Sequence, residues 1–438
     1  MEGTVSLFGE IKQIINNTET VSVKGKIDKI VGMVIESTGP NADIGTVCRI
    51  YNSKNTGYIR AEVVGFRDDR VLLMPYDDLT GIVKGSIVES TGDTLKVPVG
   101  EGLIGRVIDG FGNPIDGKGE LDIAAYYPVQ GEPANPLTRP RIKERISMRV
   151  KAIDSLLTCG KGQRMGIFAG SGVGKSTLMG MISRNIEADV NVIALVGERG
   201  REVRGFIEND LKEEGMKRTV LVVATSDQSA MMRLNCAYTA TAIAEYFKDQ
   251  GKDVLLMMDS LTRFAMAKRE TGLSIGEPPV ARGYTPSLYT VMPKLLERTG
   301  KFERGSITGI YTVLVEGDDV NEPISDTVRG ILDGHIVLSR SYAMRNHYPA
   351  IDILASVSRL MTEIVPQEHL QMASQIRATL SAYYENYDLI SIGAYKMGTN
   401  PKIDHAIQNI ERINDFLKQG IDEKISFEQT MMMQELVS

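Results

Sequence analysis

The sequence predicts a multidomain protein with a small N-terminal β-barrel, a central α/β domain with a mostly parallel sheet, and a C-terminal helical domain. Short β-branched runs, separated by Gly, Asn and Asp, fill residues 21–95. Near-continuous apolar runs then alternate with helical stretches as far as about residue 345. From Tyr348 onward the apolar residues recur with helical spacing. The three patterns are typical of a barrel, a helix-covered parallel sheet and a helical bundle, respectively.

Composition and charge restrict the class of protein. A chain of 438 residues is long enough for two or three domains. Its net charge of −6 argues against nucleic-acid binding. No apolar run approaches the ~20 residues of a membrane span, and the first residues lack a secretory signal pattern. The three isolated cysteines suit a reducing compartment, so we expect a cytoplasmic protein.

The N-terminal part is predicted to hold a helix and a barrel. Residues 1–20 carry apolar side chains at roughly helical spacing, which fits either a helix packed on its own domain or an arm that docks a partner. Residues 21–95 are predicted to form the β-barrel. Residues 96–130 then contain one short apolar pair among turn signals, and we expect a connector there.

The remaining chain is predicted to form the other two domains. A helix is expected over residues 146–158, before the first strand of the sheet. Residues 96–345 are assigned to the α/β domain, and residues 346–438 to the helical domain. The last helix is predicted to begin with a capping box, because Gln429 follows Ser426 by three residues.

One stretch, residues 165–182, indicates phosphate binding. An apolar run enters a glycine-rich loop, and a helical pattern begins at Leu178, which is the context of a P-loop. The loop amides and the helix N-terminus attract an anion, Lys175 adds a positive charge, and the Ser176 hydroxyl suits Mg²⁺. Ala169 departs from the full pattern, which has glycine there. The predicted nucleotide-binding residues are Gly170, Ser171, Gly172, Val173, Gly174, Lys175, Ser176 and Thr177.

Two carboxylates follow later apolar runs. Asp259 ends the run 253–259, as a Walker B acid does when it supports Mg²⁺ through a water. Glu198 follows the run 190–197 and could polarise a water that attacks a phosphate. A solvated charged turn explains Glu198 equally well from the residues alone. Parallel strands would place both carboxylates beside the P-loop.

These residues carry a resemblance to a known family. The stretches AGSGVGKST, VGERGREV, MMDSLTRFA and HYPAIDILASVSRL together resemble the rotary ATPase α/β superfamily, over nearly the whole chain. Within it, the stretches around Glu198 and Asp259 and the stretches 276–300 and 311–340 resemble the type III secretion ATPases, and the flagellar export ATPases most of all. The resemblance implies a RecA-like central domain and hydrolysis of ATP with Mg²⁺.

The resemblance also implies roles for single residues. Lys175 would contact the β- and γ-phosphates, and Glu198 would be the catalytic carboxylate. Arg199 would orient it, and Arg263 would lie near the active site. Asp259 and Ser176 would serve the metal, Asp259 through a water.

Two further residues are implied by the last matching stretch, HYPAIDILASVSRL. Tyr348 matches an aromatic residue that packs on adenine; packing in the core or an interface is its plain alternative. Arg359 matches an arginine finger that reaches a neighbouring subunit's nucleotide; an ordinary arginine at a helix start is the alternative. A finger that acts in trans implies a ring, for this chain a homohexamer, and relatives are hexamers. The resemblance implies that loop 276–287 of this chain would face the pore of such a ring, as the matching loop does in relatives.

The expected function is therefore ATP hydrolysis by a ring that energises flagellar type III protein export and releases substrates from chaperones. Expected partners are export regulator and stalk proteins and chaperone–substrate complexes, at the inner face of the cytoplasmic membrane, with no nucleic acid. A virulence secretion ATPase and an ATP synthase subunit are alternatives, although Glu198 disfavours the non-catalytic synthase type. An RNA-tracking helicase and a nucleotide-gated scaffold are further alternatives from other classes; the acidic chain disfavours the helicase.

Overall fold

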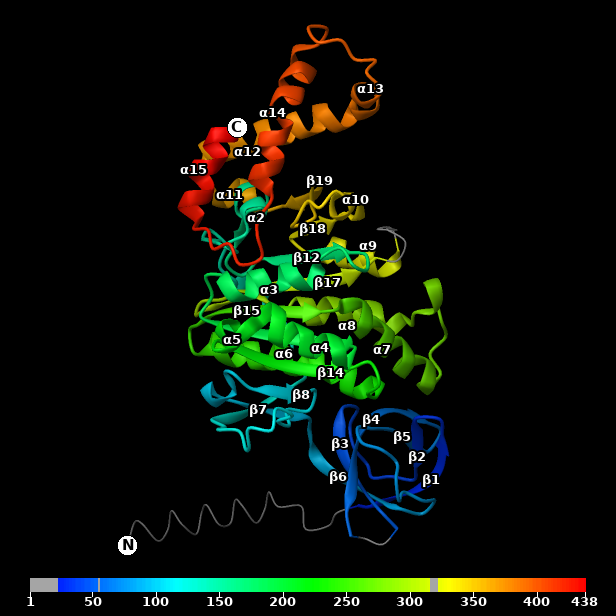
Figure 1. The fold of residues 1–438 in the computed structure, drawn as a ribbon. Helices are drawn as coiled ribbons and strands as arrows, with labels where there is room; N and C mark the ends of the chain where they lie inside the picture. The colour runs from blue at the N-terminus through cyan, green and yellow to red at the C-terminus, as the bar shows by residue number, and fades with distance from the viewer. Residues whose placement is uncertain (1–22, 54–55, 316–321) are drawn as a thin grey trace, which may run out of the picture. The chain divides into compact units, whose positions relative to one another are not determined.

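The computed structural model describes residues 23–53, 56–315 and 322–438. The chain divides into two compact units, of which one ends at Leu95 and includes Ser274–Gly276, and the other contains the remaining residues from Lys96 onward (Figure 1). The expected N-terminal helix lies outside the described residues. In the described part of the chain, no helix is long and apolar enough to cross a membrane. The predicted four-part division of the chain stays a prediction.

The first unit is a closed six-stranded barrel, as the sequence predicts. Its strands pair antiparallel in the order β1-β2-β5-β4-β3-β6. Alternate side chains point inward, and Ile35, Cys48, Ile50 and Leu73 are fully buried in its core. The strands are β1 (Gly25–Val31), β2 (Val34–Ser37), β3 (Thr46–Tyr51), β4 (Tyr58–Arg67), β5 (Arg70–Pro75) and β6 (Ile87–Thr94).

The second unit is built on a nine-stranded sheet in the order β19-β18-β12-β17-β15-β13-β14-β8, with β16 paired to β17. Every pairing is parallel except those of β19 and β16. The strands are β8 (Val107–Asp109), β12 (Arg164–Ala169), β13 (Val190–Glu198), β14 (Thr219–Thr225), β15 (Asp253–Asp259), β16 (Gly300–Lys301), β17 (Ser306–Leu314), β18 (Gly334–Leu338) and β19 (Ile351–Ser358). The mostly parallel sheet is thus confirmed.

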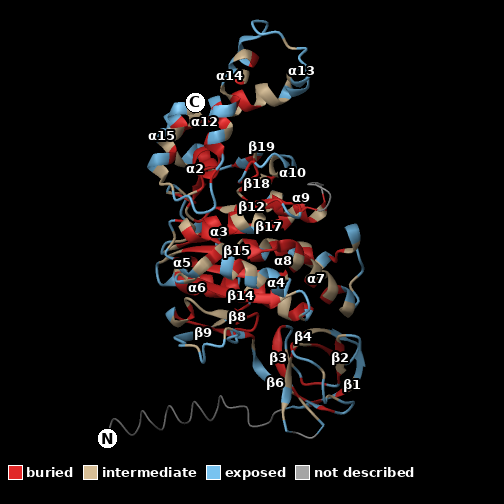
Figure 2. Ribbon diagram, in the orientation of Figure 1, coloured by how far each residue is buried: buried red, intermediate tan, exposed pale blue. Residues whose placement is uncertain are grey.

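The central strands are apolar because both faces of the sheet are covered. Eight successive residues of β13 are buried. Strands β12, β15 and β17 are also buried along most of their length (Figure 2). Helix α6 packs against β13, β14 and β15. Two short antiparallel pairs complete the strands: β7 (Lys96–Val99) with β9 (Ala125–Pro128), and β10 (Arg145–Ile146) with β11 (Cys159–Gly160).

Helices surround this sheet and form the C-terminal part of the unit. Those before residue 345 are α2 (Lys151–Leu156), α3 (Lys175–Asn185), α4 (Gly200–Gly205), η3 (Phe206–Leu211, a π-helix), α5 (Lys212–Met216), α6 (Ala230–Asp249), α7 (Leu261–Ile275), α8 (Pro286–Leu296), α9 (Pro323–Ile331) and α10 (Arg340–Met344). Three single 3₁₀ turns are η1 (Glu101–Leu103), η2 (Pro136–Thr138) and η4 (Ala281–Gly283). The later helices are α11 (Met361–Ile364), α12 (Gln367–Glu385), α13 (Tyr387–Ser391), α14 (Pro401–Leu417) and α15 (Phe427–Val437).

The capping box predicted at the last helix is present, since the Ser426 and Gln429 side chains bond each other's backbone N–H groups. The start of helix α15 contacts Arg145 of β10, whose guanidinium lies 3.5 Å from the centre of the Phe427 ring. The C-terminal helical region is therefore confirmed as part of the second unit.

Three local predictions are wrong. Val107–Asp109, expected in a connector, is the edge strand β8 of the large sheet, and two apolar residues were too weak a signal to show it. Ile351–Ser358, expected to be helical, is the antiparallel strand β19. The helix expected over 146–158 is shorter, because Arg149 has a positive φ of 58° and the helix begins at Lys151.

Candidate active site

The P-loop leaves the carboxyl end of β12 and enters α3 directly. Gly174 caps this helix with a φ of 90°, which glycine adopts without strain. A Cβ atom there would also lie 3.4 Å from the Tyr348 ring. Ala169 is the last residue of β12 and is extended, a conformation open to alanine, so its departure from the pattern costs the loop nothing.

A cavity of about 710 Å³ opens over the loop. Its volume lies within the range of small-molecule sites. Seven of the eight predicted loop residues border it, whereas the Val173 side chain is buried in the core. The full lining is Ala169, Gly170, Ser171, Gly172, Gly174, Lys175, Ser176, Thr177, Glu198, Arg199, Glu202, Thr262, Arg263, Met266, Leu314, Val315 and Arg340.

The strand order brings two carboxylates to the P-loop lysine. Strands β15 and β13 end in Asp259 and Glu198, at the same edge as the P-loop. The Lys175 ammonium pairs with Asp259 Oδ1 and lies 3.9 Å from Glu198 Oε1. The Thr312 hydroxyl donates to Asp259 Oδ1 at 2.6 Å, from the intervening strand β17. The edge therefore holds one buried cation between two carboxylates.

Glu198 has the protonation behaviour of a group that can exchange a proton near neutral pH. Burial, and next the negative charge of Asp259, raise its pKa to about 7, although the Lys175 charge opposes this. Its side chain remains 13% exposed toward the cavity. A carboxylate poised in this range can accept a proton from a water molecule that it orients.

Two arginines flank Glu198 differently. Arg263 packs on Gly197, where a Cβ atom would lie 3.1 Å from the Arg263 Cβ. Its Nε is buried and has no hydrogen-bond partner among the described residues, although its side chain borders the cavity. Arg199 is exposed and lies 3.4 Å from Glu202, so it contacts Glu202 rather than Glu198.

Tyr348 lies at the loop, on the side of the C-terminal helices. Its ring packs on Gly174, and 41% of the residue is exposed. Its carbonyl oxygen accepts from the N–H of Gln419 at 2.9 Å, just beyond α14. An aromatic face is thus available beside the phosphate loop.

Arg359 lies at the other edge of the sheet. Its N–H donates to the carbonyl oxygen of Asp333 at 2.9 Å, directly before β18, and Arg164 begins the parallel neighbour β12. The P-loop follows the opposite end of β12, six residues or roughly 20 Å away. The structure therefore gathers Lys175, Glu198, Asp259 and Arg263 but leaves Arg359 apart from them.

The sequence analysis missed other residues at this edge. Arg340 borders the cavity two residues after β18 ends, and its side chain makes no hydrogen bond or ion pair with the described residues. The rule that identified Glu198 and Asp259, polar residues at strand ends, could have found it. Thr312 carries a hydroxyl inside an otherwise apolar run. That exception in the run is the signal that could have pointed to its contact with Asp259.

Three family models match the chain. They are the ATP synthase alpha/beta family nucleotide-binding domain over residues 149–358, its β-barrel domain over 27–92, and the C-terminal domain of the type III secretion ATPase EscN over 365–435. The chain belongs to the ATP synthase alpha/beta family. The C-terminal match places it in the type III secretion branch, and the chain is an ATPase of that branch.

Relatives resemble it along almost their whole length. It is 57% identical to the "Flagellum-specific ATP synthase" of Bacillus subtilis, over 95% of each chain. It is 50% identical to the "Type 3 secretion system ATPase" of Xanthomonas euvesicatoria, over 93% of this chain and 92% of that one. Both flagellar and secretion proteins are thus similar to it.

Solved structures agree with the fold. The assembled ATPase EscN of enteropathogenic E. coli superposes with a TM-score of 0.89 at 47% identity, over 94% of this chain and 99% of that one. EscN in complex with its central stalk EscO gives a TM-score of 0.87 at 46% identity, with the same coverage. The three-part fold class is confirmed by these structures.

Proposed function

We propose that a ring of six copies of this chain hydrolyses Mg²⁺–ATP and energises the export of flagellar proteins. The observation that carries the catalytic part is the edge where Lys175 stands between Asp259 and Glu198 below a cavity of about 710 Å³. The similarity to flagellum-specific proteins, at 57% identity, supports the flagellar assignment.

The residues present fit a nucleotide and its metal. The buried Arg263 Nε at the cavity wall is a donor in need of an anionic partner. Ser176 and Asp259 offer the hard oxygen ligands that Mg²⁺ prefers, and no cluster of three or more His, Cys, Asp or Glu side chains in the described residues offers a separate metal cage. Bound Mg²⁺ would neutralise charge that develops on the phosphates. Asp259 would act on it through a water.

The chain's own groups then divide the work. Lys175 moves from the carboxylates to the β- and γ-phosphates, and the loop amides bind the same oxygens. Glu198 orients the attacking water and accepts its proton. Arg263 contacts the phosphates, and Tyr348 packs on adenine. Arg199 pairs with Glu202 and so holds that side chain at the wall of the cavity.

Charge on the transferred phosphoryl group needs one more cation, and we assign it to Arg359 of the neighbouring copy. Roughly 20 Å of β12 separates Arg359 from its own P-loop, so it acts in trans or not at all. Such a finger is worth ~10³–10⁵ in rate. Loop 276–287 faces the pore of the ring in this proposal.

The proposed partners follow from the relatives. EscN binds a central stalk, so we propose a stalk protein for this ring as well. We further propose an export regulator, chaperone–substrate complexes that the ring releases, and a location at the inner face of the cytoplasmic membrane through these partners. Virulence secretion is the second candidate, favoured by the similarity to a type III secretion ATPase at 50% identity.

The deciding experiment replaces the chromosomal gene with the Glu198→Gln variant and scores flagellar filaments, motility and delivery of proteins to host cells. We expect loss of filaments and motility with unchanged levels of the protein. Normal filaments would exclude a motor role in flagellar export. Loss of host-cell delivery with normal motility would select the virulence system instead.

A further inference from the structure

The backbone of Arg359 is fixed more firmly than its side chain. Its N–H donates to the Asp333 carbonyl oxygen at 2.9 Å. Its guanidinium Nη2 donates to the Arg329 carbonyl oxygen at 3.1 Å, and the rest of the side chain is exposed. An arginine side chain carries about 2 kcal/mol of rotamer entropy. The direction in which the guanidinium projects therefore depends on where Asp333 and Ser358 hold the end of β19.

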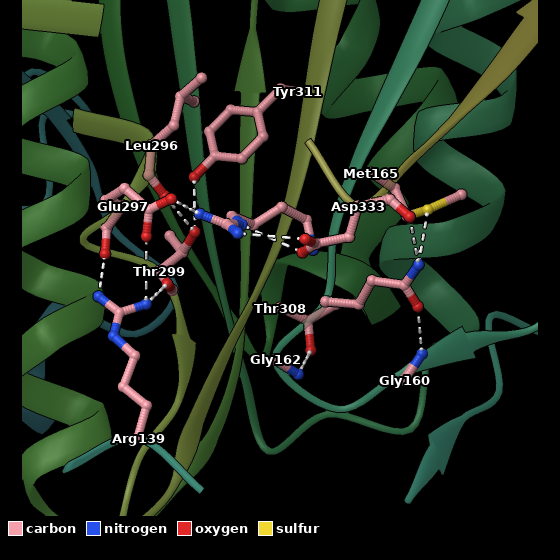
Figure 3. Close-up of polar contacts among 12 residues, drawn as sticks. Arg139, Gly160, Gly162, Met165, Leu296, Glu297, Thr299, Thr308, Tyr311 and Asp333 are labelled. Carbon is pink, nitrogen blue, oxygen red and sulfur yellow. Dashed lines mark hydrogen bonds and ion pairs between the residues drawn. The ribbon is translucent and has the colours of Figure 1, made fainter. Parts of the chain in front are cut away.

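Gln163 joins these two anchors to the base of the P-loop strand. It is fully buried directly before β12. Its Nε2 donates to the Asp333 carbonyl oxygen at 3.1 Å and to Ser358 Oγ at 3.0 Å. Its Oε1 accepts from the Gly160 N–H at 2.8 Å. Figure 3 shows the contacts of this amide with the labelled Gly160, Met165 and Asp333. A buried amide with both ends bonded has one satisfied arrangement.

The neighbouring ion pairs fix Asp333 itself. Arg164 Nε and Nη2 each donate to one carboxylate oxygen of Asp333 at 3.1 Å, and the Arg164 N–H donates to Oδ2 at 3.0 Å. Arg164 also pairs with Glu297, which Arg139 approaches within 3.6 Å (Figure 3). This two-pronged geometry holds a carboxylate in one orientation. The Ser358 hydroxyl, in turn, donates to the Thr158 carbonyl oxygen at 2.8 Å.

We propose that Gln163 and Asp333 are positioning residues for Arg359. They would set the position and direction from which the Arg359 guanidinium enters the nucleotide site of the next copy. This inference rests on the proposed role of Arg359 in trans. Neither residue borders the cavity of its own chain. Their loss should therefore slow hydrolysis at the neighbour's site and leave their own site competent.

The first test compares single variants in homogeneous rings. Gln163→Met keeps the volume but removes the amide, and Ser358→Ala removes one of its acceptors. We expect kcat to fall about tenfold or more, short of the ~10³-fold expected for Arg359→Ala, with KM within about twofold. Thr308→Val is the matched control. It removes the bond to the Gly162 N–H at 2.9 Å, in the same buried turn, and should keep the wild-type kcat (Figure 3).

The second test mixes each variant with Lys175→Ala subunits. A Lys175→Ala copy cannot turn over but supplies an intact finger, so activity per variant subunit should rise severalfold for Gln163→Met and Ser358→Ala, as for Arg359→Ala. If the substituted residue has only a structural role in its own domain, mixing should not change the activity per variant subunit.

The possible outcomes distinguish a failure of the positioning role from a failure of the proposed role of Arg359 in trans. If Arg359→Ala is slow and rescued by mixing, while Gln163→Met and Ser358→Ala keep the wild-type kcat or are not rescued, the positioning role is refuted and the finger stands. If Arg359→Ala keeps full activity, the finger itself fails. Should Gln163→Met not fold, Ser358→Ala decides alone.

Discussion

At the scale of residues, the P-loop lysine has no substitute on its edge. Its ammonium is the charge between Asp259 and Glu198, and none of the arginines that line the cavity makes a hydrogen bond or ion pair with either carboxylate in the described residues. We expect Lys175→Ala to abolish ATP hydrolysis, by at least ~10²-fold, because it removes charge from the phosphates. Circular dichroism and the thermal midpoint should stay near wild type, since the Lys175 side chain lines the cavity and is not part of the hydrophobic core. Retained turnover would disprove the assigned role.

Arg340 supports a second prediction at this scale. Among the described residues its side chain has no hydrogen-bond or ion-pair partner, and it borders the cavity together with the P-loop. Arg340→Gln should raise the KM for ATP about three- to tenfold, the loss of about 1 kcal/mol from a partly exposed charge contact, while kcat changes less than twofold. Arg340→Lys should lie between. An unchanged KM in steady-state assays at low salt would show that this arginine does not touch the nucleotide.

At the scale of elements, His347 ties the stretch before β19 to the end of α14. Burial, and next the charge of Lys418, lower its pKa to about 4, whereas Asp415 opposes this. Its ring also packs edge-on against Tyr342, with 5.0 Å between ring centres. His347 binds a proton near pH 6.5 in the unfolded chain and near pH 4 in the folded chain. The contribution of neutral His347 to the free energy of unfolding is therefore fully present above pH 6.5 and is lost as the pH drops toward 4.

The corresponding measurement is thermal unfolding between pH 7.5 and 5. Wild type should lose about 2 kcal/mol of stability to this one group by pH 5. His347→Phe, which cannot take a proton, should show a shallower loss. Replacing the exposed His405 with asparagine is the control and should leave the slope unchanged. Equal slopes in wild type and His347→Phe would contradict the buried, neutral state of His347.

The elements also show how far sequence reasoning reached. The P-loop, Glu198 and Asp259 were predictable because a long apolar run, followed by a polar residue, marks the carboxyl end of a buried parallel strand. Strand β8 was missed because two apolar residues carry no periodicity. Strand β19 was taken as helical because its apolar residues do not alternate with polar ones. Four of its eight positions are exposed or half-buried, and three of these carry Leu354, Ala355 and Val357. Contacts between distant residues, such as Gln163 with Ser358, have no local signal at all.

At the scale of the whole molecule, the proposed role of Arg359 in the neighbouring site would make each copy on its own an incomplete enzyme. We expect specific activity to rise with protein concentration as rings assemble, because an isolated chain lacks the cation at the transition state. Parallel measurements of hydrolysis and of mass by sedimentation should show both transitions at the same concentration. Arg359→Ala should assemble at that concentration without the gain in rate. Full activity in a dilute monomer would exclude a shared site.

The orientation of β12 has one more consequence. Its first residue Arg164, with Gln163 directly before it, holds Asp333 beside the arginine that we propose acts in one neighbour, and its last residue opens the loop that we propose receives the same group from the other neighbour. In a closed ring of identical copies, rotational symmetry gives every copy of β12 the same sense around the ring axis. A displacement of the loop when product leaves would travel down the strand to the next site in one rotational sense only. The ring's order of firing would then have a handedness that is built into a strand of six residues.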